Sequence, residues 1–549
     1  MERSVVTTCL IICLTLGFVS LFVVYLPNQM ANPIPSPVSS PSLSDVVADI
    51  PPEQKPFEEE ASPAAPVVEE QRPAGDGVAV EEPAPPPIAE PVEKKDKPQK
   101  FVRDIPEHFP LKMYEPLPEV AEWHFEHGFK ITPKLKPAFE FWRNVYARYD
   151  QSQAILHDNR NLDIIYGVLD FSALEDNIVL DPQEKRKLRN KVEEEKKKEL
   201  TEMLMRFENG EMPATAGEHI VYGFFENSNV PKKFERASER LRSQWGQKNR
   251  FQEGFVRAGR YMPMMEELFI REGVPKEISK LVFVESMFQL GATSKVGAGG
   301  PWQFMPATAR LYMTLNDIVD ERRDPLIAAQ SAAKLLHKNY DLVGSWPLAI
   351  NGYNTGILRM SKAARQLGTK DIGTIIERFD DPGYQFASRN FYPEFLAALD
   401  VATHHKEYFG ELELESPIPF DEIVLPYHTC LHQFSEAIGT DVGVIQDLNP
   451  AYHEKNFSPG ALVPKGYTLR VPHQQKMICL AALDQLQSRE RETRLHIVGK
   501  KESLQQIASR YQIPVGALKE TNGLISNNLK TGQLLKIPGP PTEVVLEAH

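Results

Sequence analysis

The feature that most constrains this chain is a long proline-rich segment close to its N-terminus. Residues 27–100 hold 17 of the 45 prolines, interleaved mainly with glutamate, alanine, serine and valine and with almost no aromatic residues. Proline interrupts helices and sheets, and the segment lacks the large apolar side chains that a core requires. We therefore predict a disordered linker over residues 27–100, which acts as a semi-rigid spacer in front of the folded part of the chain.

An apolar segment precedes this linker. Residues 4–26 contain no charged side chain, and residues 9–26 are rich in leucine, isoleucine, valine and phenylalanine. A run of this length is typical of a transmembrane helix and is longer than the apolar core of most signal peptides. We predict that residues 1–26 are an uncleaved membrane anchor; the alternative is a signal segment cleaved near Ala31. Both interpretations predict that the chain is exported.

The length and charge of the chain limit what it can bind. With 549 residues, it exceeds what one hydrophobic core usually supports, so roughly three or four folded units are expected. Its formal net charge is −13, and residues 27–100 contribute −8 of this total through 14 acidic and 6 basic side chains. The remainder is nearly neutral, whereas nucleic-acid-binding proteins usually have a strongly basic surface. We predict no nucleic-acid partner.

Hydropathy patterns predict a mainly α fold. Residues 101–250 have apolar and aromatic side chains at helical spacing, and the Lys/Glu-rich residues 184–208 are typical of an amphipathic surface helix. The helical pattern continues through residues 251–412. Two later segments, residues 420–472 and 494–540, each begin with a short β-like run, continue as a helix and end in apolar residues and proline. The helical spacing before residue 150 is carried by Phe139, Trp142, Val145, Tyr146 and Tyr149.

The first candidate for chemistry is an acidic residue on an apolar helix stripe. Residues 276–289 follow Pro275 and are predicted to form one helix. At 100° per residue, Glu285 lies within about 60° of four apolar side chains. These are Ile278, Leu281, Val282 and Phe288. Loss of solvation there would raise the pKa of Glu285, as a general acid requires, but a structural carboxyl that pairs with a buried arginine or caps a helix is equally compatible.

Two further groups of residues are candidates for binding. Three glycines precede Trp302 and Gln303, and such a turn allows close approach of a ligand to the backbone, while an aromatic ring and an amide suit a sugar. These glycines are Gly297, Gly299 and Gly300. Tyr353 and Asn354 follow another apolar run, and the phenol of Tyr353 could lie beside the Glu285 carboxyl. In both places an ordinary structural turn is the alternative.

Five motifs together resemble the catalytic domain of lytic murein transglycosylases. They are VESMF around Glu285, ATSKVGAGGPWQFMPATARLY at residues 292–312, VDERRDP at 319–325, GYNTG at 352–356 and RNFYPEFLAAL at 389–399. The motifs occur in the order of that family and place a catalytic domain at residues 251–412. The resemblance implies a lysozyme-like helical fold with a cleft between two lobes, in a protein of the bacterial cell envelope whose folded part faces the periplasm.

The resemblance also implies an activity. It is cleavage of the β-1,4 bond between N-acetylmuramic acid and N-acetylglucosamine in peptidoglycan, with formation of a 1,6-anhydro end and without consumption of water. Glu285 is the implied catalytic residue. The implied substrate contacts are Ser286, Gln303, Met305, Tyr353 and Asn354. Gly352 and Thr355 replace the alanines that are usual in the family, and Pro301 replaces leucine or isoleucine, so the local backbone is expected to differ.

The C-terminal segments resemble sugar-binding modules. Residues 496–538 are similar to a lysin motif (LysM), a βααβ module that binds chains containing N-acetylglucosamine, and residues 494–540 are predicted to form it. The implied glycan contacts are Glu502, Ser503, Leu504 and Asn522. Lys501 and Glu502 replace the usual Gly-Asp. Residues 420–472 match more loosely and are interpreted as a degenerate LysM-like copy, or else as a structural module without a ligand.

Two other functions are compatible with the same motifs. A hydrolytic muramidase would use a second carboxylate to activate water, and residues 317–324 contain four acidic candidates. These are Asp317, Asp320, Glu321 and Asp324. A non-catalytic peptidoglycan-binding scaffold is the other alternative. No cofactor and no metal site are predicted, because the sequence contains no zinc-type cluster, phosphate loop or dinucleotide fingerprint. Cys430 and Cys479 could pair as a disulfide or remain as two free thiols.

Overall fold

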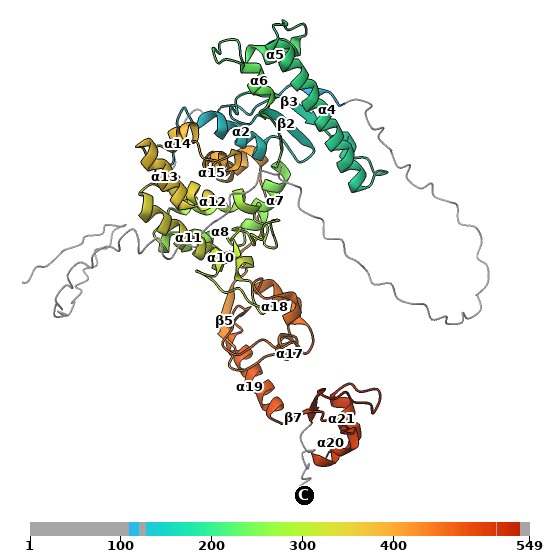
Figure 1. Ribbon diagram of the computed structural model, residues 1–549. Helices are drawn as coiled ribbons and strands as arrows, with labels where there is room; N and C mark the ends of the chain where they lie inside the picture. The colour runs from blue at the N-terminus through green and yellow to red at the C-terminus, as the bar shows by residue number, and fades with distance from the viewer. Residues whose placement is uncertain (1–108, 120–127, 493, 512, 538–549) are drawn as a thin grey trace, which may run out of the picture. The chain divides into compact units, whose positions relative to one another are not determined.

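The structure is a computed structural model that describes residues 109–119, 128–492, 494–511 and 513–537. The predicted anchor and linker lie outside the described residues. In the described part of the chain, no helix is both long enough and apolar enough to cross a membrane. Helices predominate there, and the strands form one four-stranded sheet and two pairs (Figure 1). The predicted mainly α fold class is therefore confirmed.

A four-stranded antiparallel sheet lies in the region before residue 250. Its strands occur in the order β1-β3-β2-β4. Their bounds are β1 (Leu111–Lys112), β2 (Gln153–Asp158), β3 (Ile165–Asp170) and β4 (Leu241–Trp245). The expectation of a helical region over residues 101–250 is thus correct only in part. The central strands β2 and β3 are buried on both faces, so neither shows the polar–apolar alternation by which a strand is recognised in a sequence.

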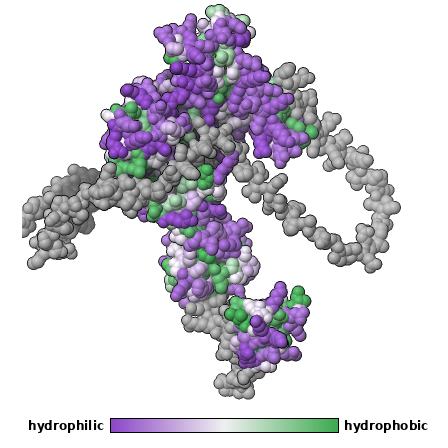
Figure 2. Space-filling view, in the orientation of Figure 1, coloured by the Kyte–Doolittle hydropathy of each residue, from purple (hydrophilic) through white to green (hydrophobic). Residues whose placement is uncertain are grey.

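Helices surround this sheet. They are α2 (Lys136–Ala147), α3 (Ser172–Glu175), α4 (Pro182–Glu208), α5 (Ala216–Gly223) and α6 (Lys233–Ser238). Helix α4 begins with a capping box of Asp181 and Glu184 and buries Leu200, Leu204 and Phe207 against the sheet. Its other residues are largely exposed, and the surface around α4–α6 is mainly hydrophilic in Figure 2. The predicted amphipathic surface helix is confirmed.

A helical region follows, built around one buried helix. Its long central helix α15 (Phe386–Thr403) packs against α2, against the helix that carries Glu285 and against α12. The other helices are α7 (Lys248–Ala258), α8 (Met262–Arg271), η2 (Lys276–Lys280), α9 (Leu281–Ser286), α10 (Pro306–Ala309), η3 (Glu321–Arg323), α11 (Pro325–Val343), α12 (Trp346–Thr355), α13 (Ile357–Leu367), α14 (Ile372–Arg378) and α16 (His405–Phe409).

The segment over residues 276–289 differs from the single helix that its sequence predicts. It begins as the 3₁₀ helix η2, continues as α9, and ends at Met287 and Phe288, which both adopt left-handed backbone conformations. Helix α7 lies against this ending: the carbonyl of Met287 comes so close to Gly254 that a Cβ there would be 2.3 Å away, and Arg257 donates a hydrogen bond to the same carbonyl. Packing of α7 therefore explains the early end of the helix.

Residues 420–472 form a βααβ unit, here called the first module. Strands β5 (Phe420–Val424) and β6 (Thr468–Pro472) pair antiparallel, with Phe420 opposite Pro472. Between them lie α17 (Leu431–Ala437), α18 (Val442–Leu448) and η4 (Glu454–Phe457), and α19 (Lys476–Glu492) follows β6. Cys430 and Cys479 are free and buried, which excludes the predicted alternative of a disulfide between them in this structure.

Residues 494–537 form a second βααβ unit, here called the second module. Strands β7 (Arg494–Ile497) and β8 (Leu534–Ile537) pair antiparallel, with Arg494 opposite Ile537. Helices α20 (Leu504–Arg510) and α21 (Val515–Thr521) lie between them in the sequence. Its small core is apolar and includes Leu504, Ile507 and Leu535. Both modules therefore have the order of elements that the sequence predicts.

Candidate active site

Glu285 lies near the end of helix α9, among the apolar side chains that the sequence places beside it. Ile278, Leu281, Val282 and Phe288 are all fully buried, while Glu285 itself remains partly exposed. Burial of its carboxyl disfavours the charged form and raises its pKa to about 8, and the negative charge of Glu394 acts in the same direction. At neutral pH most molecules therefore carry a proton on Glu285, as the sequence analysis predicts for a general acid.

Glu394 is a second carboxyl in this site, and the sequence analysis did not single it out. It lies on α15, where the Tyr146 hydroxyl donates a hydrogen bond of 2.7 Å to its Oε1 atom. Burial raises the pKa of Glu394 to about 7, although the Tyr146 hydrogen bond and the charge of Arg242 lower it. The signal that could have found Glu394 is the one used for Glu285, an acidic residue inside an otherwise apolar helical run.

Two hydrogen bonds connect the helices of the site to one peptide segment. The Ser286 hydroxyl donates to the carbonyl of Pro301 over 2.8 Å, and the Tyr353 hydroxyl donates to the carbonyl of Trp302 over 2.9 Å. Because Ser286 follows Glu285 in α9 and Tyr353 belongs to α12, both helices are fixed to the start of the same turn. The site residues predicted from three separate motifs therefore do lie together.

Tyr353 and Asn354 have different environments. Tyr353 is buried, and burial together with the nearby charge of Glu285 raises the pKa of its phenol well above the usual value. Its hydroxyl is a hydrogen-bond donor that stays protonated at any working pH. Asn354 is partly exposed, and its Oδ1 atom accepts a hydrogen bond of 3.4 Å from Ser388. The amide nitrogen of Asn354 remains the more available group for a substrate.

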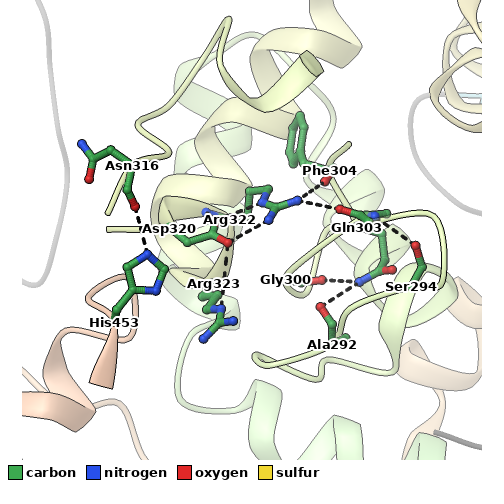
Figure 3. Close-up of polar contacts among 12 residues, drawn as sticks. Ala292, Ser294, Gly300, Gln303, Phe304, Asn316, Asp320, Arg322, Arg323 and His453 are labelled. Atoms are coloured by element: carbon green, nitrogen blue, oxygen red, sulfur yellow. Dashed lines mark hydrogen bonds and ion pairs between the residues drawn. The ribbon is translucent and has the colours of Figure 1, made fainter. Parts of the chain in front are cut away.

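Gln303 lies in the glycine-rich loop, here defined as residues 297–304. Its side-chain nitrogen donates to the carbonyls of Gly300, at 2.7 Å, and Ala292, at 3.5 Å, as Figure 3 shows. The amide thus holds the turn on which it lies, and a sugar contact would use its oxygen. Met305 follows the loop as the residue before α10 and is partly exposed. Contact of Gln303 and Met305 with substrate stays a prediction.

Two interpretations of the glycine-rich loop need correction. Trp302 is fully buried and stacks on Phe269 with ring centroids 5.4 Å apart, so this ring belongs to the core and cannot stack on a sugar. The glycines allow close approach of another part of the chain: a Cβ on Gly300 would lie 1.7 Å from the carbonyl oxygen of Arg322, and one on Gly299 would lie 2.9 Å from the Arg322 guanidinium carbon. Their absent side chains make room for residue 322.

The acidic residues at positions 317–324, considered above as bases for a hydrolase, mostly have structural partners. Asp320 forms a bidentate ion pair with Arg322, at 2.8 and 2.9 Å. Glu321 accepts a hydrogen bond from the Thr314 amide. Asp324 accepts bonds from the first amides of α11 and pairs with Arg470. Asp317 is exposed. None of the three engaged carboxylates is available to activate water.

In the second module, the four predicted glycan contacts have roles within the module itself. Glu502 accepts hydrogen bonds from the Gly499 amide and from His496, at 2.8 and 2.7 Å, and these bonds lower its pKa. Ser503 caps helix α20, and Leu504 is buried in the core. The side-chain amide of Asn522 donates hydrogen bonds to the Leu518 and Lys536 carbonyls and accepts one from the Lys536 amide. A glycan contact by Leu504 would require the core to open, which corrects that expectation; for the other three it stays a prediction.

Metal ions in proteins are usually held by His, Cys, Asp and Glu side chains. Among the residues that the structure describes, no group of three or more His, Cys, Asp or Glu side chains is arranged to hold a metal ion. The groups that the candidate site does offer are the carboxyls of Glu285 and Glu394, the Tyr353 hydroxyl and the side-chain amides of Gln303 and Asn354.

Comparison with protein families defines the class of two regions. Residues 266–376 match the family described as Transglycosylase SLT domain, and residues 496–538 match the LysM domain. The first range contains Glu285, the glycine-rich loop and Tyr353, and the second coincides with the second module. Neither range includes residues 420–472. The chain thus carries a transglycosylase domain and a peptidoglycan-binding module, in agreement with the resemblance found in the sequence.

The chain is also similar to individual proteins. The chain is 25% identical over 354 residues to membrane-bound lytic murein transglycosylase D of Escherichia coli (strain K12), an alignment that covers 60% of this chain and 73% of that protein. It is also 30% identical over 104 residues to a putative tributyltin chloride resistance protein of Alteromonas sp. (strain M-1), which covers 18% of this chain and 49% of that protein.

Proposed function

We propose that this chain is a peptidoglycan lytic transglycosylase that is exported and held on the cell wall. The observation that carries the proposal is the place of Glu285 within the matched transglycosylase domain, near the end of α9 among four buried apolar side chains. Its pKa of about 8 means that the carboxyl holds a proton under physiological conditions, and it remains partly open to solvent. Among the residues that the structure describes, none forms a hydrogen bond or ion pair with this carboxyl, so no structural acceptor holds its proton.

The proposed reaction uses Glu285 twice. The carboxyl first donates its proton to the oxygen that links N-acetylmuramic acid to N-acetylglucosamine, and the glycosidic bond breaks. Positive charge develops at the anomeric carbon, where the acetamido carbonyl of the substrate stabilises it. Glu285, now a carboxylate, then accepts the proton of the C6 hydroxyl of the same sugar as that oxygen attacks the anomeric carbon. The product is a 1,6-anhydro ring, and one carboxyl suffices where most glycosidases need two.

Glu394 makes the proposed acid dependent on a neighbouring charge. Two carboxyls that interact in a buried site do not ionise independently, and the apparent pKa values belong to the pair. Because a negative charge on Glu394 opposes ionisation of Glu285, Glu394→Gln removes this repulsion and lowers the pKa of Glu285. We expect the alkaline limb of the pH–activity profile, near pH 8 in the unmodified chain, to move to lower pH in this variant. An unchanged limb would contradict the coupling.

The position of Glu394 near Glu285 favours a second candidate function. A hydrolytic muramidase needs a carboxylate to activate water, and Glu394 lies close enough to Glu285 to raise its pKa. One of its oxygens already accepts the Tyr146 hydroxyl, and its own raised pKa makes it a partly protonated base at neutral pH. Both features disfavour the hydrolase. In a hydrolase, Glu394→Gln would abolish activity rather than shift its pH dependence.

Attachment to the wall and membrane completes the proposal. The second module supplies affinity for glycan strands, and the transglycosylase domain supplies the chemistry; joined in one chain, each raises the local concentration of substrate for the other. Residues 1–26 are proposed to anchor the chain in the membrane and residues 27–100 to act as a tether, with the folded part facing the periplasm. The assignment of residues 101–250, 251–412, 420–472 and 494–540 as separate regions is part of the same proposal.

The experiment that tests this function is replacement of the proposed acid. Glu285→Gln preserves the size of the side chain but cannot donate a proton as the carboxyl does, so we expect release of soluble fragments from purified peptidoglycan to fall by about 10³-fold or more. Sedimentation with insoluble peptidoglycan should be unchanged. Glu267→Gln is the matched control, because Glu267 is exposed on α8 of the same domain and its carboxylate pairs with the exposed Arg271. Activity retained in Glu285→Gln would remove the assignment.

A further inference from the structure

We propose that the first module holds the glycine-rich loop in place, and that Arg322 is the positioning residue that transmits this support to Gln303. Residues 314–324, here called the junction segment, connect the two. The sequence analysis interpreted residues 420–472 as a glycan-binding copy or as a structural module, and the contacts below favour a structural role directed at the active site. The proposal rests on the proposed function only for its kinetic readout.

The junction segment contributes to the interior of the first module. Val319 is 3% exposed and belongs to the same apolar cluster as Ile423, Phe434 and Leu469 of the module. Its backbone forms an antiparallel bridge with Tyr452. Backbone hydrogen bonds also join the residues next to this bridge. These bonds run from the Asp320 amide to the Ala451 carbonyl, 2.8 Å, and from the His453 amide to the Ile318 carbonyl, 3.1 Å.

Side chains add further hydrogen bonds across the same boundary. The Nδ2 atom of Asn316 donates to the Tyr467 hydroxyl over 2.9 Å. The Nδ2 atom of Asn456 donates to the Ile318 carbonyl over 2.8 Å. A ring nitrogen of His453 lies 2.9 Å from the Asn316 carbonyl, and Figure 3 shows these two residues facing each other. Backbone and side chains both take part, so the junction segment is joined to the first module through an isolated β-bridge and several hydrogen bonds.

An ion pair between buried side chains fixes the end of the junction segment. The Arg470 guanidinium donates to both carboxylate oxygens of Asp324, at 2.6 and 3.2 Å. The side chains of Arg470 and Asp324 are 9% and 3% exposed. Asp324 also caps α11, the helix that follows the junction segment. Breaking one partner of a buried pair leaves the other charge without compensation, so this contact strongly disfavours separation of the module from the catalytic region.

Arg322 extends from the junction segment to the glycine-rich loop. Its Nη1 atom donates to the carbonyls of Gly297 and Phe304, at 2.8 and 3.1 Å, which are the two ends of the loop. The other side of the guanidinium is held by both carboxylate oxygens of Asp320. A guanidinium whose planar fork is fixed by a carboxylate presents its remaining donors in a defined direction. Figure 3 shows Arg322 between Asp320 and this loop.

The loop needs such support because its backbone is strained. Gln303 adopts a φ of 46°, in the left-handed region that residues other than glycine rarely occupy. Such a conformation persists where the surroundings hold it, and here it determines the direction of the Gln303 amide. Ser286 and Tyr353 hold the residues just before Gln303 from the side of α9 and α12. Arg322, in the junction segment, bonds to the two ends of the loop. Loss of the Arg322 bonds, or of those from Ser286 and Tyr353, therefore removes one of the two sets of contacts that hold the turn.

The first test compares two adjacent arginines in the full-length chain. Arg322→Met removes the four hydrogen bonds of the guanidinium, whereas Arg323→Met is the matched control, because Arg323 is 44% exposed and reaches Asp320 only at 4.0 Å. We expect kcat/KM on soluble glycan strands to fall about 10- to 100-fold in Arg322→Met, mainly through a higher KM, since misplacement of a positioning group by about 1 Å can cost that much. Arg322→Lys should recover part of the loss. Equal kinetics for both methionine variants would overturn the proposal.

The second test measures the loop directly and does not depend on catalysis. Arg470→Gln breaks the pair with Asp324 without touching the glycine-rich loop. We expect amide hydrogen exchange of residues 292–304 to accelerate at least about tenfold in Arg470→Gln and in Arg322→Met, but not in Arg323→Met. If the module opens or unfolds in Arg470→Gln while residues 292–304 keep their protection, the transmission through Arg322 is wrong. If the unmodified chain has no lytic activity, the proposed function fails and this exchange measurement still decides the present proposal.

Discussion

In each of the two βααβ modules of this chain, one asparagine side chain makes the same set of hydrogen bonds to the backbone. In the first module the side chain of Asn449 donates to the Arg470 carbonyl over 2.7 Å and accepts from the Arg470 amide over 2.8 Å. In the second module the side chain of Asn522 makes the same two bonds with Lys536, both at 2.7 Å. Each asparagine also donates to the helix before it, at 2.7 Å. The asparagine therefore ties the second helix to the closing strand in both modules.

The two modules differ in what the closing strand contacts. Because the same asparagine bonds identify them, Arg470 and Lys536 occupy equivalent positions on β6 and β8. Arg470 is 8% exposed and paired with Asp324, whereas Lys536 is exposed. The first module thereby becomes part of the catalytic region, and only the second coincides with the matched LysM range. The same βααβ order of elements therefore occurs in two different surroundings, and Arg470 and Lys536 mark one of the differences.

The largest difference between the modules is expected when these equivalent residues are replaced. Arg470→Met leaves the buried Asp324 carboxylate without its cationic partner, although the α11 amides still bond to it, and should destabilise the first module by about 3–5 kcal/mol. Lys536→Met changes an exposed side chain and should alter the stability of the second module by no more than about 0.5 kcal/mol. Opening free energies from hydrogen exchange of the β6 and β8 amides measure each module separately. Similar values for both variants would contradict the assigned difference.

A smaller difference in stability between the two modules is expected when Asn449 and Asn522 are each replaced. Asn449 is 4% exposed, so Asn449→Ala leaves the Arg470 amide and carbonyl buried without partners, which should cost about 1–3 kcal/mol. Asn522 is partly exposed, and water can reach the groups freed by Asn522→Ala, so we expect a cost near the lower end of that range. Exchange rates of the adjacent strand amides provide the measurement. A larger cost in the second module would mean that the asparagine bonds are not equivalent.

Much of the site could be predicted from the sequence because the decisive information is local. The position of Glu285 among apolar residues on one helix face predicts a raised pKa. Its four apolar neighbours are buried, and although Glu285 itself is partly exposed, loss of solvation raises the pKa of its carboxyl. The family resemblance implies that Tyr353 lies beside the same carboxyl, which agrees with the effect of the Glu285 charge on its phenol. The spacing between residues of one helix, or of one known motif, can be read directly from the sequence.

Other features depend on contacts between distant residues, and a single sequence contains no spacing for them. The end of α9 at Met287 is set by α7, and the sheet before residue 250 was missed because its central strands are buried on both faces. The Asp324–Arg470 pair joins residues 146 positions apart. Trp302 was interpreted as suited to a sugar, but its ring is buried in the core, and of the glycines before it Gly300 makes room for the Arg322 carbonyl and Gly299 for the Arg322 guanidinium.

Identification of the products tests the central claim most directly. Purified peptidoglycan is digested with the full-length chain, and the soluble muropeptides are analysed by mass spectrometry. Attack by the C6 hydroxyl through Glu285 predicts fragments that end in a 1,6-anhydro sugar and are lighter by one water molecule than hydrolysis products. Fragments with reducing ends would contradict the account, because they require an activated water in place of the intramolecular attack.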